Sequence, residues 1–198
     1  MKKLLAAMFL AVAMVAPAFA VMEFDLKAGY IIEPTITETG ANEYKCTYSQ
    51  DPSYSVGADL YFFVIDCLGI GVGGSYIFDS DFDGKKWKGL VEDVKSGSTN
   101  IYATVKPVLA EKGLVDRVYL VGQLGMGITE FSSDYDDYNF SENGLYWGAG
   151  LGIEKANILV ELLYSVNYWE HNDDLAWNKG WSYTTRRIAV NVGYKFGF

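Results

Sequence analysis

Ile188-Ala-Val-Asn-Val-Gly-Tyr-Lys-Phe-Gly-Phe198 is the stretch of sequence on which the fold class rests. Every second residue from Ile188 to Phe198 is large and apolar, and the residues between them are small, polar or charged. Successive side chains of a β-strand point to opposite faces, so this stretch predicts a strand with one wholly apolar face. It shows no helical period.

Seven earlier segments follow the same rule, with apolar residues at alternate positions and glycine, polar or charged residues between them. They are residues 24–32, 56–62, 70–78, 101–106, 118–129, 145–154 and 158–168. Alternating segments of this length are typical of strands that cross the bacterial outer membrane. We therefore predict an all-β fold, an antiparallel up-and-down eight-stranded transmembrane β-barrel.

The connections between these segments alternate in length. Long connections are expected at residues 34–53, 79–99, 131–144 and 170–185, and short ones at 64–68, 109–117 and 155–157. Outer-membrane barrels have longer extracellular loops and short periplasmic turns. With an even number of strands, this arrangement predicts that both termini lie in the periplasm.

The first twenty residues have the pattern of a secretory signal peptide. Lys2 and Lys3 precede an apolar run over residues 4–15, and Ala18 and Ala20 flank the expected cleavage point. The run is too short and wrongly flanked for the alternative, an N-terminal membrane anchor. We expect a signal peptide at 1–20 and one barrel domain at 21–198.

The charge of the mature chain limits its partners. Removing Lys2 and Lys3 leaves 14 basic against 25 acidic residues, a net charge of −11. Nucleic acid is not an expected partner, because phosphate contacts need clustered Lys and Arg. No later stretch approaches the ~20 apolar residues of a transmembrane helix.

The residues between the apolar ones indicate which face meets lipid. A soluble periplasmic barrel, similar to a lipocalin, would bury the apolar face and turn Gly148, Gly150 and Gly152 to water. Glycine weakens a strand there and packs against nothing. Inside a narrow eight-stranded barrel, small residues instead leave room for large side chains from neighbouring strands. This favours an apolar face that points outward to lipid.

Aromatic residues near the strand ends support the membrane interpretation, because their rings favour the membrane–water boundary. One predicted band, at the periplasmic rim, contains Phe24, Phe62, Tyr194, Phe196 and Phe198. The other, at the outer rim, contains Tyr30, Tyr76, Trp147, Tyr168 and Trp169.

The C-terminal stretch also resembles a known motif. A chain that ends on Phe198, with Tyr194 and Phe196 at alternate positions before it, resembles the β-signal of bacterial outer-membrane proteins. The mature chain as a whole resembles the OmpA/OmpX-type outer-membrane β-barrel family. The resemblance implies recognition by the barrel-assembly machinery, with these three residues as the assembly signal. It also implies roles such as envelope integrity, adhesion or narrow-channel activity.

Eight charged residues fall on predicted inward positions: Asp25, Lys27, Asp59, Lys106, Glu154, Glu161, Arg187 and Lys195. Buried charges persist when they are paired or hydrogen-bonded, and four acids here balance four bases. We therefore predict a structural ion network that closes the lumen rather than an ion-selective pore. Antiparallel pairing of the last two strands predicts an ion pair between Glu161 and Lys195.

No constellation of residues predicts catalysis. The one histidine, His171, lies in a predicted loop beside Glu170 and Asp173, where a general base would lack an oriented partner and a target. Asp79 and Asp81 superficially resemble one acidic pair of omptin-type proteases, but those barrels have ten strands. An enzyme acting on lipid A or peptides stays the second alternative function.

The predicted loop over residues 133–142 is acidic and rich in tyrosine. Asp134, Asp136 and Asp137 are oxygen ligands of the kind that calcium takes, but the EF-hand spacing is missing, and a solvated acidic loop is favoured. Exposed tyrosines supply rigid amphipathic area and suit contact with an extracellular partner. No metal and no cofactor are expected.

Two cysteines lie in different predicted connections, Cys46 in the first loop and Cys67 in the first turn. An oxidising envelope favours disulfides, but a strand of about ten residues spans roughly 25 Å of membrane and separates these two. We expect them not to bridge. The alternative is that residues 43–50 fold downward as an extra strand.

The sequence thus favours a structural or surface-interaction role, in adhesion or envelope integrity, with the lumen closed. The expected surroundings are outer-membrane lipid and lipopolysaccharide, and the expected state is a monomer. A narrow porin-like channel for ions or small solutes is the first alternative.

Overall fold

The structure, a computed structural model, describes residues 21–40, 45–81, 94–111, 114–133, 140–170 and 181–197. Most of these residues form nine strands: β1 (Met22–Thr39), β2 (Lys45–Ser49), β3 (Ser53–Ile65), β4 (Leu68–Asp81), β5 (Val94–Glu111), β6 (Arg117–Ser133), β7 (Phe140–Lys155), β8 (Ile158–Glu170) and β9 (Ser182–Gly197). Within these ranges, no helix is long and apolar enough to span a membrane.

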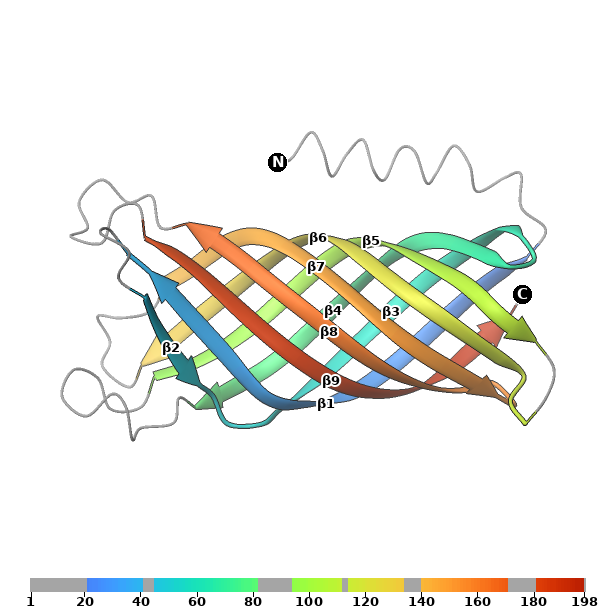
Figure 1. Cartoon of the computed structure of the whole chain (residues 1–198), viewed down its shortest axis with the longest axis horizontal. Coiled ribbons are helices and arrows are strands. Elements are labelled where there is room, and N and C mark those ends of the chain that lie inside the picture. Colours follow the sequence, from blue (N-terminus) through green and yellow to red (C-terminus); the bar gives the residue numbers. More distant parts are fainter. Residues whose placement is uncertain are drawn as a thin grey trace.

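Eight of the strands close into a barrel. Each strand from β3 to β9 pairs antiparallel with the next, β1 pairs with β3, and β1 also pairs with β9, which closes the sheet (Figure 1). Closure removes the unpaired edges that an open sheet would present, and a membrane tolerates no such edge. The predicted up-and-down eight-stranded barrel is confirmed.

The ninth strand, β2, lies where the sequence predicted only a loop. β1 has an irregularity between Ile32 and Thr35, and beyond it residues Thr35–Thr39 pair with β2 on one side and with β9 on the other. The strand therefore extends one end of the barrel. It does not fold downward along the wall, as the alternative interpretation of residues 43–50 required.

The other long connections are also shorter than predicted. β5 begins at Val94 and β6 ends at Ser133, inside the expected loops, and β9 begins at Ser182. The hydrogen-bonded ladder continues past the apolar band, for example where Thr37 pairs with Thr184. The outward residues there are polar, so the alternation that predicts strands disappears although the strand itself continues.

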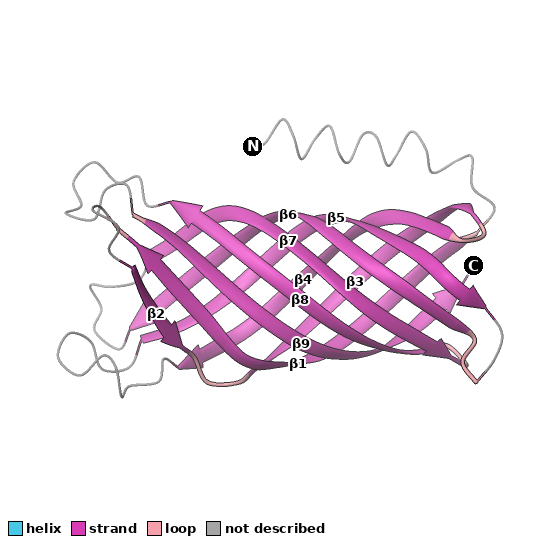
Figure 2. Cartoon of the chain, viewed as in Figure 1, coloured by secondary structure: helices cyan, strands magenta, loops and turns pink. Residues whose placement is uncertain are grey.

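The two ends of the barrel differ. One end, here called the turn end, holds the short connections after β3, β5 and β7 (Figure 2). Met22, the first residue of β1, and Gly197, the last residue of β9, lie at the same end. The β7–β8 turn is tight, and Ala156 and Asn157 both have positive φ. A two-residue hairpin of this kind matches the right-handed twist of its strands. The opposite end, with β2, is the loop end.

The faces of the strands agree with the predicted alternation. On β8, Leu162 is 53% exposed, whereas its neighbours Glu161 and Leu163 are 1% and 8% exposed. On β9, Val190 points outward and Asn191 is buried. The outward face is apolar from strand to strand, which is the arrangement that lipid requires and water does not.

Two members of the predicted aromatic bands face differently from the expectation. Trp169 is 2% exposed and points into the barrel, because its neighbour Tyr168 takes the outward position and adjacent strand residues alternate. Phe62 has the outward parity but is 7% exposed. Tyr30, Tyr76, Trp147, Tyr168, Tyr194 and Phe196 are exposed, as predicted. The ring of Phe196 contacts those of Phe24 and Tyr194, with centroids 6.0 and 4.8 Å apart. Phe198 lies outside the described residues.

Inward glycines make room for large side chains. A methyl group added at Gly152 would collide with the ring of Tyr119, and one added at Gly73 would collide with Asp59 and Tyr102. Tyr119 and Tyr102 are almost fully buried. The lumen is therefore filled by a few large side chains that lie over glycine backbone, as the sequence predicted.

Candidate functional site: the filled lumen

The turn end of the lumen is closed by ion pairs around Lys106. Its Nζ contacts Glu23 and lies 2.8 Å from Asp25 Oδ2. Glu23 also accepts a hydrogen bond of 2.9 Å from Arg117, and Lys195 pairs with Glu154. The three acids and three bases of this layer balance in charge.

Aromatic rings surround the same lysine. Lys106 Nζ lies 4.9 Å from the ring centroid of Tyr61 and 4.5 Å from that of Tyr119, and its side chain is fully buried. A cation over a ring face gains further attraction when it is removed from water. Lys106 is thus the central cation of the turn-end layer.

A second group lies one layer further along the strands. Lys27 Nζ lies 2.6 Å from Asp59 Oδ2 and 3.2 Å from Glu161 Oε1. Asn191 donates a hydrogen bond of 3.1 Å to Glu161. All three charged side chains are nearly buried. Their pairing offsets the cost of removing charge from water, but one carboxylate remains in excess within the group.

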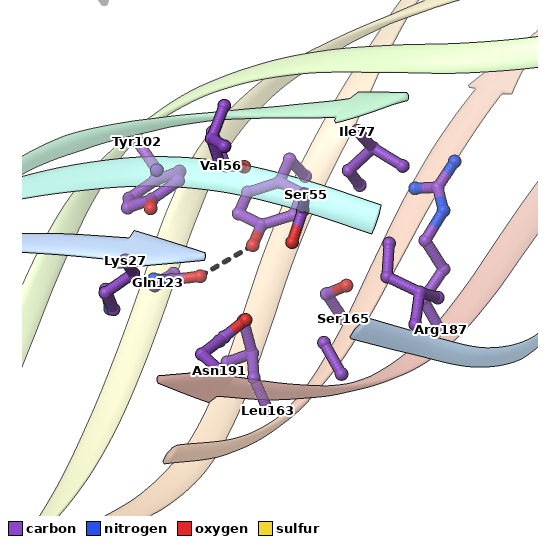
Figure 3. A pocket seen from close by; sticks show the side chains of 15 residues that line it. Lys27, Ser55, Val56, Ile77, Tyr102, Gln123, Leu163, Ser165, Arg187 and Asn191 are labelled. Atoms are coloured by element: carbon purple, nitrogen blue, oxygen red, sulfur yellow. Dashed lines mark hydrogen bonds between the residues drawn. The ribbon is translucent and has the colours of Figure 1, made fainter. Parts of the chain in front are cut away.

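Arg187, in β9, differs from the other buried cations. It is 3% exposed, and within the described residues no carboxylate lies in ion-pair distance of it. Its Nη1 has no hydrogen-bond partner. Arg187 instead borders a cavity of about 40 Å³ in the middle of the barrel, with Lys27 on the other side of it in the view of Figure 3.

Towards the loop end the lumen is closed by uncharged side chains. Asn167 donates hydrogen bonds to Ser98 (2.8 Å) and Asn100 (3.1 Å) across the barrel. Ile31 and Ile77 also pack together, on the side of the Lys27 group that faces the loop end. All of these side chains are buried.

Aromatic residues occupy the mouth at the loop end. Trp169 stacks on Tyr183 with centroids 5.6 Å apart, and the ring of Phe131 lies 5.9 Å from Trp169. Tyr183 and Tyr48 donate hydrogen bonds to the two carboxylate oxygens of Glu38, of 3.1 and 3.2 Å. Burial raises the pKa of Tyr48, and Glu38 adds to the rise, so this hydroxyl stays a donor.

The predicted inward charges are all buried or nearly so, but their pairing is different. Glu161 bonds to Lys27, and Lys195 bonds to Glu154, so the expected Glu161–Lys195 pair is wrong. Arg187 was expected in the network and has no acidic partner there. The register explains the error, because Glu161 lies opposite Asn191, four residues before Lys195 in the chain.

Two residues of the network escaped the sequence prediction. Glu23 is the second residue of β1 and Arg117 the first of β6, and both have the inward parity that their strands share with Asp25 and Tyr119. That parity is the signal that could have identified them. Both fall just outside the apolar segments from which the strands were predicted.

The remaining candidates assemble no further site. His171 and the acidic residues Asp134, Asp136 and Asp137 lie outside the described residues. Asp79 and Asp81 are exposed at the end of β4. The described ranges hold no group of three or more His, Cys, Asp or Glu residues that could bind a metal ion.

A closed antiparallel barrel with an apolar outer face and a filled polar lumen defines a membrane-spanning barrel. The sequence matches the outer membrane protein beta-barrel domain over residues 4–196. The chain belongs to this family of bacterial outer-membrane proteins.

Several solved structures are similar to this chain at low sequence identity. Neisserial surface protein A is 14% identical, with a TM-score of 0.51 and coverage of 87% of this chain and 97% of that chain. Ail, the attachment invasion locus protein of Yersinia pestis, is 18% identical, with a TM-score of 0.44 and coverage of 88% and 98%. The N-terminal barrel domain of Pseudomonas aeruginosa OprF is 12% identical, with a TM-score of 0.45 and coverage of 88% and 97%. No curated protein sequence matches significantly.

Proposed function

We propose that this protein is a closed outer-membrane barrel whose role is structural or surface-interacting, in envelope integrity or adhesion, and that it does not conduct ions or solutes. The observation that carries the proposal is the filling of the lumen at three levels. Ion pairs occupy the turn end, the Lys27 group occupies the middle, and the aromatic cluster around Trp169 occupies the loop end.

The loop end is the part that remains for contact with other molecules. β1 and β2 carry the sheet beyond the barrel wall, and Tyr48 and Tyr183 lie at the mouth with Glu38 between them. Tyrosine side chains give rigid area with few rotatable bonds, which suits recognition of a protein or glycan. A barrel that holds such an end rigidly acts as a platform.

Conductance separates this proposal from the channel alternative. The purified, folded protein is expected to produce no discrete current steps in a planar lipid bilayer, because the buried ion pairs and the apolar layers leave no hydrated path. A known porin reconstituted in the same lipid serves as the positive control. Reproducible steps from the folded protein, with none from a heat-unfolded sample, would establish the channel instead.

The orientation also belongs to the proposal, with the turn end in the periplasm and the loop end outside. Cys46 lies in β2 at the loop end and Cys67 in the turn after β3, and both are free thiols. A membrane-impermeant maleimide is expected to label Cys46 on intact cells and Cys67 only after the outer membrane is permeabilised. Cys46→Ser and Cys67→Ser variants assign each signal. Labelling of Cys67 alone on intact cells would mean the opposite orientation.

A further inference from the structure

Arg187 is the one buried cation of the described lumen that the ion pairs leave unmatched. A guanidinium that is 97% removed from solvent without an acidic partner is costly, because a charge loses its hydration and gains no opposite charge in return. A buried donor without an acceptor, such as its Nη1, indicates that water or an ion fills the place.

The cavity beside Arg187 has the lining of an anion site. Two cations border it, Lys27 and Arg187, and no carboxylate does. Hydroxyl and amide groups of Ser55, Ser165 and Asn191 lie around the same space (Figure 3). Asp59 and Glu161 belong to the Lys27 group but do not line the cavity. The space is therefore bordered by positive charge and by a few hydroxyl and amide groups, with apolar side chains on the rest of its wall.

The cavity is large enough to hold a small ion. Its volume of about 40 Å³ exceeds the roughly 10–15 Å³ that a single water molecule requires. A monatomic halide together with ordered water fits such a space. Ile31, Ile77 and Ala189 line the cavity and form one buried apolar cluster.

We propose that the cavity beside Arg187 binds a chloride ion, which supplies the negative charge that the guanidinium lacks. The ion is enclosed as the barrel closes and acts as a structural ligand. The alternative is that water alone fills the cavity and that the excess carboxylate of the Lys27 group balances Arg187 through space. Bound chloride and water alone make different predictions: only bound chloride makes the stability of the barrel depend on which anion is in solution.

The stability test uses the full barrel refolded from denaturant into detergent, in sodium chloride or in sodium gluconate at the same ionic strength. The thermal unfolding midpoint is expected to be higher in chloride and to rise further with chloride concentration, because a ligand that binds only the folded state stabilises it. Gluconate is too large for the cavity and screens surface charge equally.

A matched pair of variants separates this site from general salt effects. Arg187→Met is expected to abolish the difference between the two salts, and Arg186→Met to preserve it. Arg186 is adjacent in the same strand, points to the outer face and is exposed. Equal midpoints for the unaltered protein in both salts, or an anion dependence that survives Arg187→Met, would overturn the proposal.

Diffraction decides the question without any variant, should Arg187→Met fail to fold. Crystals of the unaltered barrel refolded and grown in sodium bromide are expected to show an anomalous peak in the cavity, within contact distance of the Arg187 guanidinium. Water density without an anomalous peak, or an Arg187 side chain turned to pair with Glu161, would contradict the chloride site.

Discussion

Replacement of Lys106 by methionine is expected to lower the free energy of unfolding by about 3–5 kcal/mol, the cost of leaving a buried charge unpaired. Lys106 is fully buried, and it is the cation nearest to Asp25, at 2.8 Å. Glu23 retains Arg117 after the change, but Asp25 has no second ion-pair partner among the described residues. One Asp25 oxygen already lacks a hydrogen bond, so little remains to stabilise this carboxylate.

The measurement is equilibrium unfolding of the barrel in lipid vesicles, with a double-mutant cycle. Asp25→Asn removes the stranded charge, so the Lys106→Met and Asp25→Asn double variant is expected to recover most of the loss. Lys155→Met, at the exposed end of β7, is the control and is expected to stay within about 0.5 kcal/mol. If Lys106→Met costs no more than Lys155→Met, the ion pairs do not hold the turn end closed.

Replacement of Leu162 by arginine is expected to cost about 2–4 kcal/mol, the penalty for a cation on the lipid face near the bilayer midplane. Leu162 points outward and lies in register between Leu151 and Val190, which are also outward and apolar. It is the fifth residue of β8, about 10 Å from the turn end at ~3.3 Å per residue and a tilt of ~40°.

The control for this prediction is the same substitution at a position nearer the membrane surface. Ile158→Arg, on the same face at the first position of β8, is expected to cost about 0–1 kcal/mol because the side chain reaches the interface. Ser165→Ala, on the lumen side, is expected to show no penalty of this kind. Equal costs for arginine at Leu162 and Ile158 would argue that neither position lies in a bilayer.

The sequence predicted the strands and their faces because both depend on a local pattern. A residue such as Glu161 is inward by parity alone, and parity needs no knowledge of neighbouring strands. The same pattern identified eight inward charged residues, all of which join ion pairs or border the cavity. It gave no signal where both faces are polar, as in β2. The placement of Trp169 in the outward aromatic band was wrong because it departed from the alternation with Tyr168.

Pairing along the lumen was not predictable in the same way. A register shift of two residues leaves every side chain on its face but changes its neighbour, so parity cannot distinguish the two arrangements. The observed register places Glu161 opposite Asn191 and Ile158 opposite Tyr194. The irregularity of β1 between Ile32 and Thr35 shifts the pairing again at the loop end. These features depend on the packing of the whole barrel.

Accessibility of spin labels along β8 tests the central claim, an apolar face in lipid around a closed lumen. Single cysteines at residues 160 to 165, in a background without Cys46 and Cys67, carry the labels in lipid vesicles. Labels at Val160, Leu162 and Tyr164 are expected to collide with oxygen and not with a water-soluble nickel chelate, and labels at Leu163 and Ser165 with neither. Nickel access at Leu162 would show that the apolar face meets water, and nickel access at Ser165 would show an open, hydrated lumen; either result would contradict this account.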